Sequence, residues 1–189
     1  MQYYITRMSG FPEEKQKEFF AFLDKEKKGE YLSATNENRK KSILLSQGFA
    51  KDKIAETYSL DKKEIIFSVT PFGKPYCKSH KEIYFSLSHS GDFLALAIDD
   101  RDVGIDIEKI RAAKENLIDR VCCKNEKDRI FSSRNPDIEF TKIWTRKEAY
   151  LKALGTGIDR ELVSIDTTDK NLKFTTETTE DFIVSVFCL

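Results

Sequence analysis

Hydrophobic residues recur at helical spacing in the first third of the chain. A helix is predicted from about residue 12 to 25, where Phe19, Phe20 and Leu23 share one face. A second is predicted from 36 to 58, although Gly48 in its interior lowers the helix propensity. The first third is therefore expected to be mainly helical.

The spacing then changes to alternation, which is typical of strands. Residues 65–69 alternate before a turn, and short strands are predicted at 84–88, 93–98 and 103–109. The polar stretch 99–102 between the last two is typical of a hairpin loop. Residues 83–109 are thus expected to form antiparallel sheet.

Helical spacing returns from 136 to 154, and Gly155 and Gly157 supply the stop. The tail from 172 to 189 alternates enough for two more strands. Helices and strands are mixed without a regular βαβ repeat, which favours an α+β fold. A boundary near residue 100 is expected, with an amino-terminal lobe at 1–100 and a carboxy-terminal lobe at 101–189, although no Pro/Gly/Ser-rich linker marks it.

The composition is that of a packed globular protein, with 189 residues, 40% hydrophobic residues and 14 Phe. Lys plus Arg and Asp plus Glu are each 32, so the formal charge is zero, which argues against a general nucleic-acid binder. No apolar stretch reaches the roughly 20 residues that span a bilayer, and the first ten residues lack the apolar core of a secretory signal. A cytoplasmic protein without a membrane segment is expected.

The four cysteines are Cys77, Cys122, Cys123 and Cys188. An adjacent pair does not suit a disulfide framework, so reduced, packed thiols are expected. A zinc site built from three of them and His80 is the weaker alternative, because neighbouring cysteines rarely satisfy tetrahedral geometry.

Candidate chemistry begins in the segment 103–108, Val-Gly-Ile-Asp-Ile-Glu. Strand alternation places Asp106 and Glu108 on one face, and Gly104 removes bulk where a large ligand could approach. Paired carboxylates repel one another unless a cation lies between them, and hard oxygen ligands suit Mg²⁺. An exposed strand with solvated acids is the alternative interpretation.

Glu148 and Lys152 are four residues apart in the predicted helix 136–154 and share a face, with Lys147 beside them. A surface ion pair explains this spacing equally well on its own. The functional interpretation makes Glu148 a third metal ligand and has Lys152 reach a phosphate.

The remaining candidates lie in two short polar segments. Ser88 and His89 are adjacent on an extended chain and point apart, so they suit hydrogen-bond donors to a phosphate better than a nucleophile–base pair. Lys74 lies in a Gly-Lys-Pro turn whose restricted backbone makes it a usable phosphate contact. Structural turn residues are the alternative for both.

In chain order, Gly-Lys-Pro at 73–75, Ser-Leu-Ser-His-Ser at 86–90, Gly-Ile-Asp-Ile-Glu at 104–108 and Trp-Thr-Arg-Lys-Glu-Ala-Tyr-Leu-Lys at 144–152 resemble the 4'-phosphopantetheinyl transferase superfamily. The resemblance is to its larger, two-lobed class. It implies a pseudo-dimer of two similar α+β lobes, each a small, mostly antiparallel sheet packed with helices, with coenzyme A bound between them. The partner it implies is an acyl or peptidyl carrier protein, and a monomer is expected.

The resemblance also implies roles for individual residues. Asp106, Glu108 and Glu148 are expected to hold Mg²⁺, and Glu148 and Lys152 to act in catalysis. The coenzyme A contacts that it implies are Lys27, Arg39, Lys41, Lys74, Ser88, His89 and Lys152. The family has an arginine in the second helix, but an ungapped alignment places Ser42 at that position in this chain. Arg39 and Lys41 are the candidates to replace it.

The implied reaction is Mg²⁺-dependent transfer of 4'-phosphopantetheine from coenzyme A to a carrier-protein serine, releasing 3',5'-ADP. Glu148, directly or through water, is the candidate base for the serine hydroxyl. Two alternatives stay open: a coenzyme A or carrier-protein binding module without turnover, and magnesium-dependent nucleotidyl transfer or phosphohydrolase chemistry without a protein acceptor.

Overall fold

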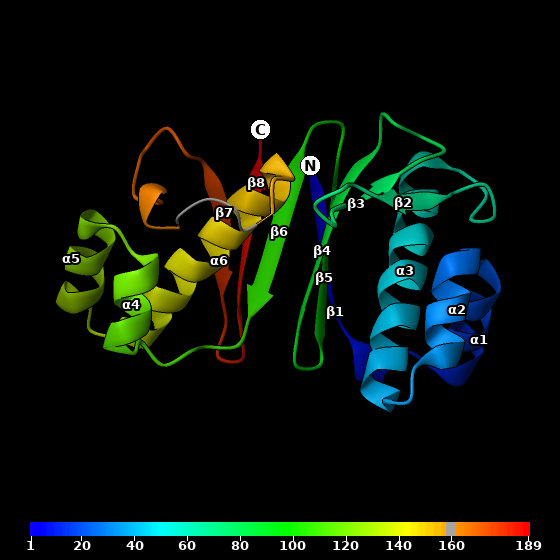
Figure 1. Cartoon of the computed structure of the whole chain (residues 1–189), viewed down its shortest axis with the longest axis horizontal. Coiled ribbons are helices and arrows are strands. Elements are labelled where there is room, and N and C mark those ends of the chain that lie inside the picture. The colour runs from blue at the N-terminus through cyan, green and yellow to red at the C-terminus, as the bar shows by residue number, and fades with distance from the viewer. Residues whose placement is uncertain (158–161) are drawn as a thin grey trace.

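A computed structural model describes residues 1–157 and 162–189 and confirms the mixed α+β architecture (Figure 1). Small antiparallel sheets lie in the middle of the molecule, with helices on either side. Among the described residues, no helix is long and apolar enough to cross a bilayer. In chain order the elements are β1 (Gln2–Arg7), η1 (Met8–Gly10), α1 (Glu13–Phe22), α2 (Lys25–Ser33), α3 (Glu37–Tyr58), β2 (Phe67–Val69), β3 (Pro75–Cys77), β4 (Tyr84–Ser90), β5 (Phe93–Asp99), β6 (Val103–Glu108), α4 (Glu115–Val121), α5 (Lys124–Ser132), α6 (Pro136–Leu154), η2 (Leu162–Ser164), β7 (Phe174–Thr178) and β8 (Ile183–Cys188).

Two three-stranded sheets share one topology. Their orders are β1-β5-β4 and β6-β8-β7, so in each the first strand pairs with the last, and the last pairs with the one before it. In both, helices lie between the first strand and the final hairpin, and in the amino-terminal lobe the two-stranded β2-β3 sheet lies there as well. The amino-terminal lobe (β1 to β5) and the carboxy-terminal lobe (β6 to β8) thus repeat one arrangement, which confirms the pseudo-dimer that the resemblance implied.

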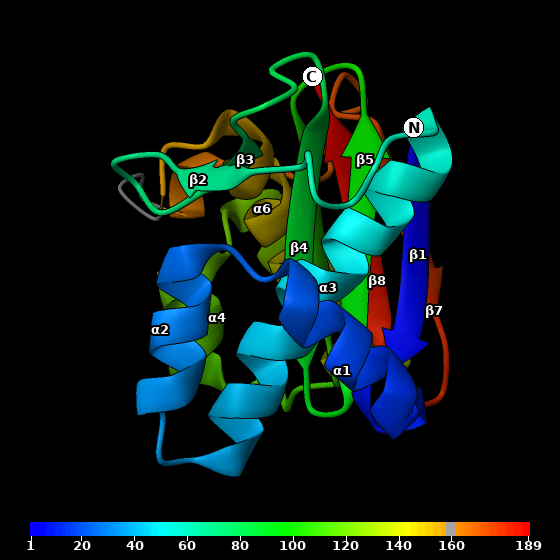
Figure 2. The ribbon, with the colours of Figure 1, turned by 90° about the vertical axis from the view of Figure 1, so that its right-hand side faces the viewer.

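Helix α3 packs on one face of the amino-terminal sheet (Figure 2). The Asn36 side chain caps its start, and Ser59 ends it in the left-handed conformation, so it has the predicted limits within a residue. Its apolar face packs with Leu94 and alternate residues of β5. A Cβ on Gly48 would lie 2.3 Å from the ring of Phe19, so this glycine allows α1 to approach α3 closely.

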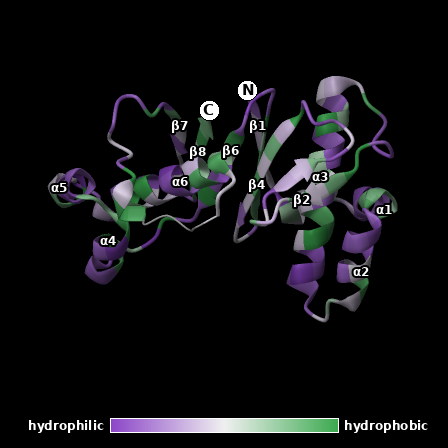
Figure 3. Ribbon diagram, turned by 45° about the horizontal axis from the view of Figure 1, so that its top comes forward, coloured by the Kyte–Doolittle hydropathy of each residue, from purple (hydrophilic) through white to green (hydrophobic). Residues whose placement is uncertain are grey.

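Strand alternation divides the core into layers. Leu94, Leu96 and Ile98 of β5 pack with α3, whereas Phe93, Ala95 and Ala97 on its other face pack with Ile105, Ile107, Val184 and Val186 of the carboxy-terminal lobe. Hydrophilic residues predominate on the outer helices α2, α4 and α5 (Figure 3). The order of layers is therefore helix, sheet, sheet, helix, and the two sheets share one apolar interface.

The hairpin predicted at 99–102 is wrong. Strand β5 pairs with β1 and β4, and β6 pairs with β8, so this segment is the crossover between the two sheets. Strand β5 is the central strand of its sheet and has no free edge to offer to β6. Asp99 stabilises the crossover by accepting hydrogen bonds from the backbone N–H groups of Asp100 and Arg101.

Helix α6 packs directly on β6. Asn135 caps its start, Pro136 is its first residue, and Gly155 follows its last residue at a φ of 67°, as the predicted limits require. At Gly104 an added Cβ would lie 1.9 Å from the carbonyl oxygen of Ala149. Gly104 therefore makes room for a helix backbone, and the expectation that it makes room for a ligand is wrong.

We predict that Gly104→Ala destabilises the fold by about 3 kcal/mol or more, because the methyl group would overlap helix backbone rather than a movable side chain. Urea unfolding followed by circular dichroism measures the loss. Gly29→Ala in α2 is the matched control, since nothing lies within 4 Å of its added Cβ and alanine favours a helix by up to about 1 kcal/mol. Equal stability of both variants and the parent would contradict the close packing of α6 on β6.

Candidate active site

Strands β4 and β6 meet where the lobes join, and alternate serines of β4 bridge them. We call Ser86, Ser88 and Ser90 the serine seam. Ser86 Oγ accepts a hydrogen bond from the backbone N–H of Ile105 at 3.1 Å, and Ser88 Oγ donates to Asp106 at 2.8 Å. Hydroxyl groups thus connect the two sheets in place of a backbone ladder.

Asp106 has one satisfied carboxylate oxygen and one unsatisfied. Oδ1 accepts hydrogen bonds from Ser88 Oγ and from Lys152 Nζ, the latter at 2.7 Å. Oδ2 is buried and has no hydrogen-bond partner among the described residues. A buried carboxylate oxygen without a partner costs free energy, and a bound cation would satisfy it.

Glu108 lies two residues further along β6 and is held at both oxygens. Oε1 accepts from the Arg111 guanidinium at 2.7 Å, and Oε2 accepts from Ser90 Oγ at 2.7 Å. The Arg111 guanidinium also lies 4.8 Å from the centre of the Trp144 ring. The carboxylate is therefore oriented by the serine seam on one side and by a stacked arginine on the other.

Glu148 projects from α6 toward these two acids and is half-buried. Burial raises the pKa of Glu148 above its ordinary value, and the nearby negative charges of Asp106 and Glu108 raise it further. The structure thus brings Asp106, Glu108 and Glu148 into one electrostatic environment, from a strand and a helix about forty residues apart in the chain.

Among the described residues, Cys123, Glu126 and Asp166 are the metal-ligand side chains whose ligand atoms all lie within 4.8 Å of one another. These groups already have partners. Glu126 accepts hydrogen bonds from the N–H and hydroxyl of Thr167, and its other oxygen lies 2.6 Å from the Lys147 ammonium. Glu126 is fully buried and its charge is already balanced by the buried Lys147 ammonium, so we assign the cluster a structural role.

Lys147, next to Glu148 in sequence, points away from the acids. It is 1% exposed and donates hydrogen bonds to the carbonyl oxygens of Val121, Leu162 and Ile165. Together with the ion pair to Glu126, these contacts tie α6 to α4, α5 and the segment that begins at η2. Adjacent residues on a helix point about 100° apart, so one lysine of this motif supports the fold while Glu148 faces the acids.

Two lysines from different lobes flank the acids. Lys152 Nζ donates to Asp106 and, at 3.1 Å, to the carbonyl oxygen of Ile105. Lys74 follows Gly73, whose φ of 83° forms the turn between β2 and β3. The Lys74 ammonium donates to the carbonyl oxygen of Ala153 at the end of α6 and to Asp102. This turn of the amino-terminal lobe is therefore anchored to the other lobe.

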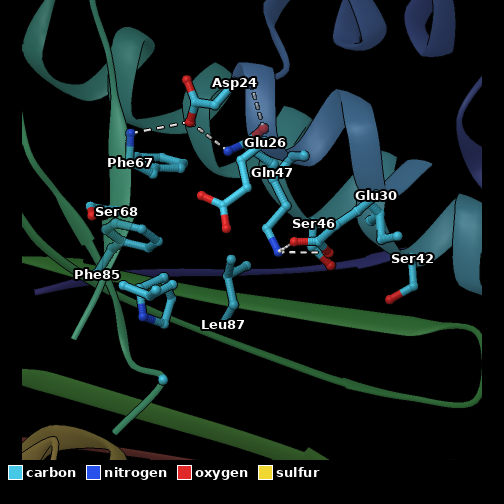
Figure 4. Close-up of a pocket in the computed structure, with 15 residues that line it drawn as sticks. Asp24, Glu26, Glu30, Ser42, Ser46, Gln47, Phe67, Ser68, Phe85 and Leu87 are labelled. Atoms are coloured by element: carbon cyan, nitrogen blue, oxygen red, sulfur yellow. Dashed lines mark hydrogen bonds and ion pairs between the residues drawn. The ribbon is translucent and has the colours of Figure 1, made fainter. Parts of the chain in front are cut away.

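Two adjoining cavities form a groove beside these residues. The proximal cavity, about 320 Å³, is lined by Lys74, Glu148, Lys152 and their neighbours. The distal cavity, about 390 Å³, lies between α2, α3 and the strands, and Figure 4 shows Phe67, Phe85 and Leu87 along its strand side. Gly73, Pro75 and Leu87 line both cavities, so they are parts of one groove.

The other predicted contacts fall in different places. Lys27 lines the distal cavity, and so does Ser42, whereas Arg39 and Lys41 do not. His89 is exposed and lines neither cavity. Ser88 is turned toward Asp106 rather than into the groove. Lys152 thus contacts Asp106, and Glu148 lies close enough to Asp106 and Glu108 to be affected by their charges, although the ligand atoms of the three acids do not all lie within 4.8 Å of one another. Arg39, Lys41 and His89 line neither cavity.

Models of two related families match successive parts of the chain. Residues 12–101 match "4'-phosphopantetheinyl transferase, N-terminal", and residues 102–186 match the "4'-phosphopantetheinyl transferase superfamily". The two matches meet at the crossover between the lobes.

Individual proteins are similar over part of their length. The 4'-phosphopantetheinyl transferase psf-1 of Bacillus pumilus is 35% identical over 123 residues, which are 64% of this chain and 53% of that protein. The 4'-phosphopantetheinyl transferase Sfp of Bacillus subtilis is 29% identical over 154 residues, which are 80% of this chain and 69% of that protein. The match thus spans about half to two thirds of these relatives. Among solved structures, a Thermotoga maritima holo-[acyl-carrier-protein] synthase is similar with a TM-score of 0.41 at 20% identity. That match covers 45% of this chain and 60% of the synthase chain.

We predict that Glu148→Gln stabilises the metal-free protein at neutral pH, because it removes a buried charge that two other acids repel. Since the folded-state pKa of Glu148 is raised, the carboxyl costs no stability below its ordinary pKa of 4.5, and the cost appears as pH rises through the folded pKa. Urea unfolding in a chelator at pH 4 and pH 7.5 should therefore show a gain only at the higher pH. A gain of equal size at both pH values would contradict the electrostatic origin.

Proposed function

Because the chain belongs to the 4'-phosphopantetheinyl transferase superfamily, we propose that it is an enzyme that transfers 4'-phosphopantetheine from coenzyme A to a serine of an acyl or peptidyl carrier protein. Asp106 carries this proposal: its buried Oδ2 is unpartnered, and its Oδ1 is held by Lys152, which lines the proximal cavity together with Glu148. We also propose that residues 1–100 and 101–189 are the two domains, that the protein acts as a monomer, and that it works in the cytoplasm without nucleic-acid or membrane partners.

Asp106, Glu108 and Glu148 would hold Mg²⁺. Three carboxylates supply the hard oxygen ligands that this ion prefers. Burial raises the pKa of Glu148 most, and the charges of Asp106 and Glu108 raise it further, a repulsion that a cation would relieve. When bound, the ion would neutralise charge that develops on the diphosphate during transfer. The unpartnered Oδ2 of Asp106 supports the fit of this donor set.

Coenzyme A would lie along the groove. Its diphosphate belongs near the proximal cavity, where Lys152 and Lys74 supply positive charge. Its adenosine belongs in the distal cavity, where the half-buried Phe67 ring, packed on the buried Phe85, offers apolar surface and Lys27 lies at the helical side. Ser88 would act indirectly, by orienting Asp106.

In this arrangement the carrier-protein serine hydroxyl attacks the β-phosphorus while the bond to the nucleotide phosphate breaks, and 3',5'-ADP leaves. Glu148 would accept the serine proton, since a raised pKa makes its carboxylate a better base than an ordinary glutamate. Lys152 would stabilise negative charge on the diphosphate, and its hydrogen bond to Asp106 holds the ammonium in place beforehand.

The direct test incubates the protein with coenzyme A, Mg²⁺ and a panel of apo carrier proteins and reads the carriers by intact mass. We expect the mass of one phosphopantetheine to be added, and chelation of the metal to abolish the addition. Coenzyme A binding by the folded protein without transfer to any carrier would favour the binding-module alternative, and nucleotide turnover without a carrier would favour hydrolase chemistry.

Substitution of the proposed site residues should remove activity without unfolding the protein. Asp106→Asn and Lys152→Met are each expected to lower the rate of transfer by about a hundredfold or more, the usual loss when a preorganised charge is removed. Glu115→Gln, at the exposed start of α4, is the control that should keep the parent rate. Near-parental rates for both site variants, with folding verified by circular dichroism, would refute the assignment.

A further inference from the structure

The distal cavity holds more negative than positive charge. Its lining includes three acids, Asp24, Glu26 and Glu30, but a single cation, Lys27. The Lys27 ammonium is already paired within α2, since it donates to both carboxylate oxygens of Glu30 at 2.8 and 3.0 Å. This pair fits the helical spacing i, i+3 and neutralises both charges.

The other two acids, Asp24 and Glu26, leave no positive charge available in the cavity. Asp24 accepts a hydrogen bond from Lys51 at 2.7 Å and another from Gln47, so its charge is balanced by a lysine whose side chain is 3% exposed. Glu26 has no ion pair among the described residues, and Figure 4 shows its carboxylate directed from α2 toward the strand side of the cavity. The sum over the cavity and its paired lysines is about one negative charge.

Ser42 contributes no charge where α3 borders the cavity. The basic residues that precede it on that helix, Arg39, Lys40 and Lys41, lie outside the lining. A phosphate monoester carries a charge of about −2 at neutral pH and is bound where arginine or lysine side chains are available to it. The distal cavity therefore offers apolar surface to an uncharged nucleoside, whereas the one cation that a 3'-phosphate would meet in its lining, Lys27, is already paired with Glu30.

We propose that this protein binds the nucleotide end of its donor without recognising a 3'-phosphate, so that 3'-dephospho-coenzyme A is a substrate at least as good as coenzyme A. The inference rests on the proposed function. The step is otherwise unchanged: the serine oxygen bonds to the β-phosphorus, its proton passes to the base, and the bond to the α-phosphate oxygen breaks. The leaving group is then 5'-AMP rather than 3',5'-ADP.

Isothermal titration calorimetry with Mg²⁺ and without a carrier compares the two donors directly. We expect the affinity for 3'-dephospho-coenzyme A to equal or exceed that for coenzyme A. Tighter binding of coenzyme A by more than about tenfold, a difference of 1.4 kcal/mol, would overturn the inference. Transfer assays with both donors should give the same ranking of kcat/KM.

Two variants test the charge argument. Glu30→Gln releases Lys27 from its ion pair, and Ser42→Arg adds a cation to the lining, so each should tighten coenzyme A by roughly three- to tenfold and leave 3'-dephospho-coenzyme A nearly unchanged. Glu37→Gln is the matched control, because it makes the same charge change and breaks a similar i, i+3 pair, to Lys40, outside the groove. Two results would count against the cavity charge as the cause. One is a gain in coenzyme A affinity in the Glu37 control as large as that in the Glu30 variant, and the other is unchanged coenzyme A affinity in both the Glu30 and the Ser42 variants.

The outcomes separate this inference from the proposed function. If neither donor yields a modified carrier but both bind with the expected ranking, the inference stands as a binding preference and the proposed transfer fails. If transfer proceeds with coenzyme A and the dephosphorylated donor is poorly bound and poorly used, the proposed function stands and the inference fails.

Discussion

The hydrogen bond from Ser88 to Asp106 is the contact on which the site depends. It joins the amino-terminal sheet to the carboxy-terminal sheet and at the same time holds one oxygen of the carboxylate, while Lys152 holds it from α6. The other oxygen is thereby left buried and unpaired. The contact that joins the two lobes thus also leaves the second oxygen of Asp106 available to a ligand.

The duplicated topology explains why the site forms where it does. Strands β4 and β6 are both at sheet edges, so each has backbone groups that its own sheet does not use. The serine seam satisfies some of them across the lobe interface, because hydroxyls both donate and accept. The acids of β6 and α6 come from one lobe, and most of the groove wall comes from the other.

The sequence predicted the elements whose ends are chemically marked. Helices α3 and α6 have asparagine caps and left-handed ends, and the acids of β6 follow from strand alternation. The crossover at 99–102 was mistaken for a hairpin because local pattern does not reveal which edges are already paired. Gly104 was misjudged for the same kind of reason, since the helix backbone that it contacts is distant in the chain. Strand β1 and helices α2, α4 and α5 were not predicted; they are short elements of six to nine residues, over which a periodic pattern has few repeats.

The two hydrogen bonds of Lys74 link the groove wall in the amino-terminal lobe to the carboxy-terminal lobe. The turn that carries Lys74 forms part of the wall of both cavities. The Lys74 ammonium donates hydrogen bonds to the carbonyl oxygen of Ala153 and to Asp102, both in the opposite lobe. Separating the lobes would break both of these hydrogen bonds. A molecule that contacts both lobes in the proximal cavity would therefore stabilise their association, and the association of the lobes would in turn favour its binding.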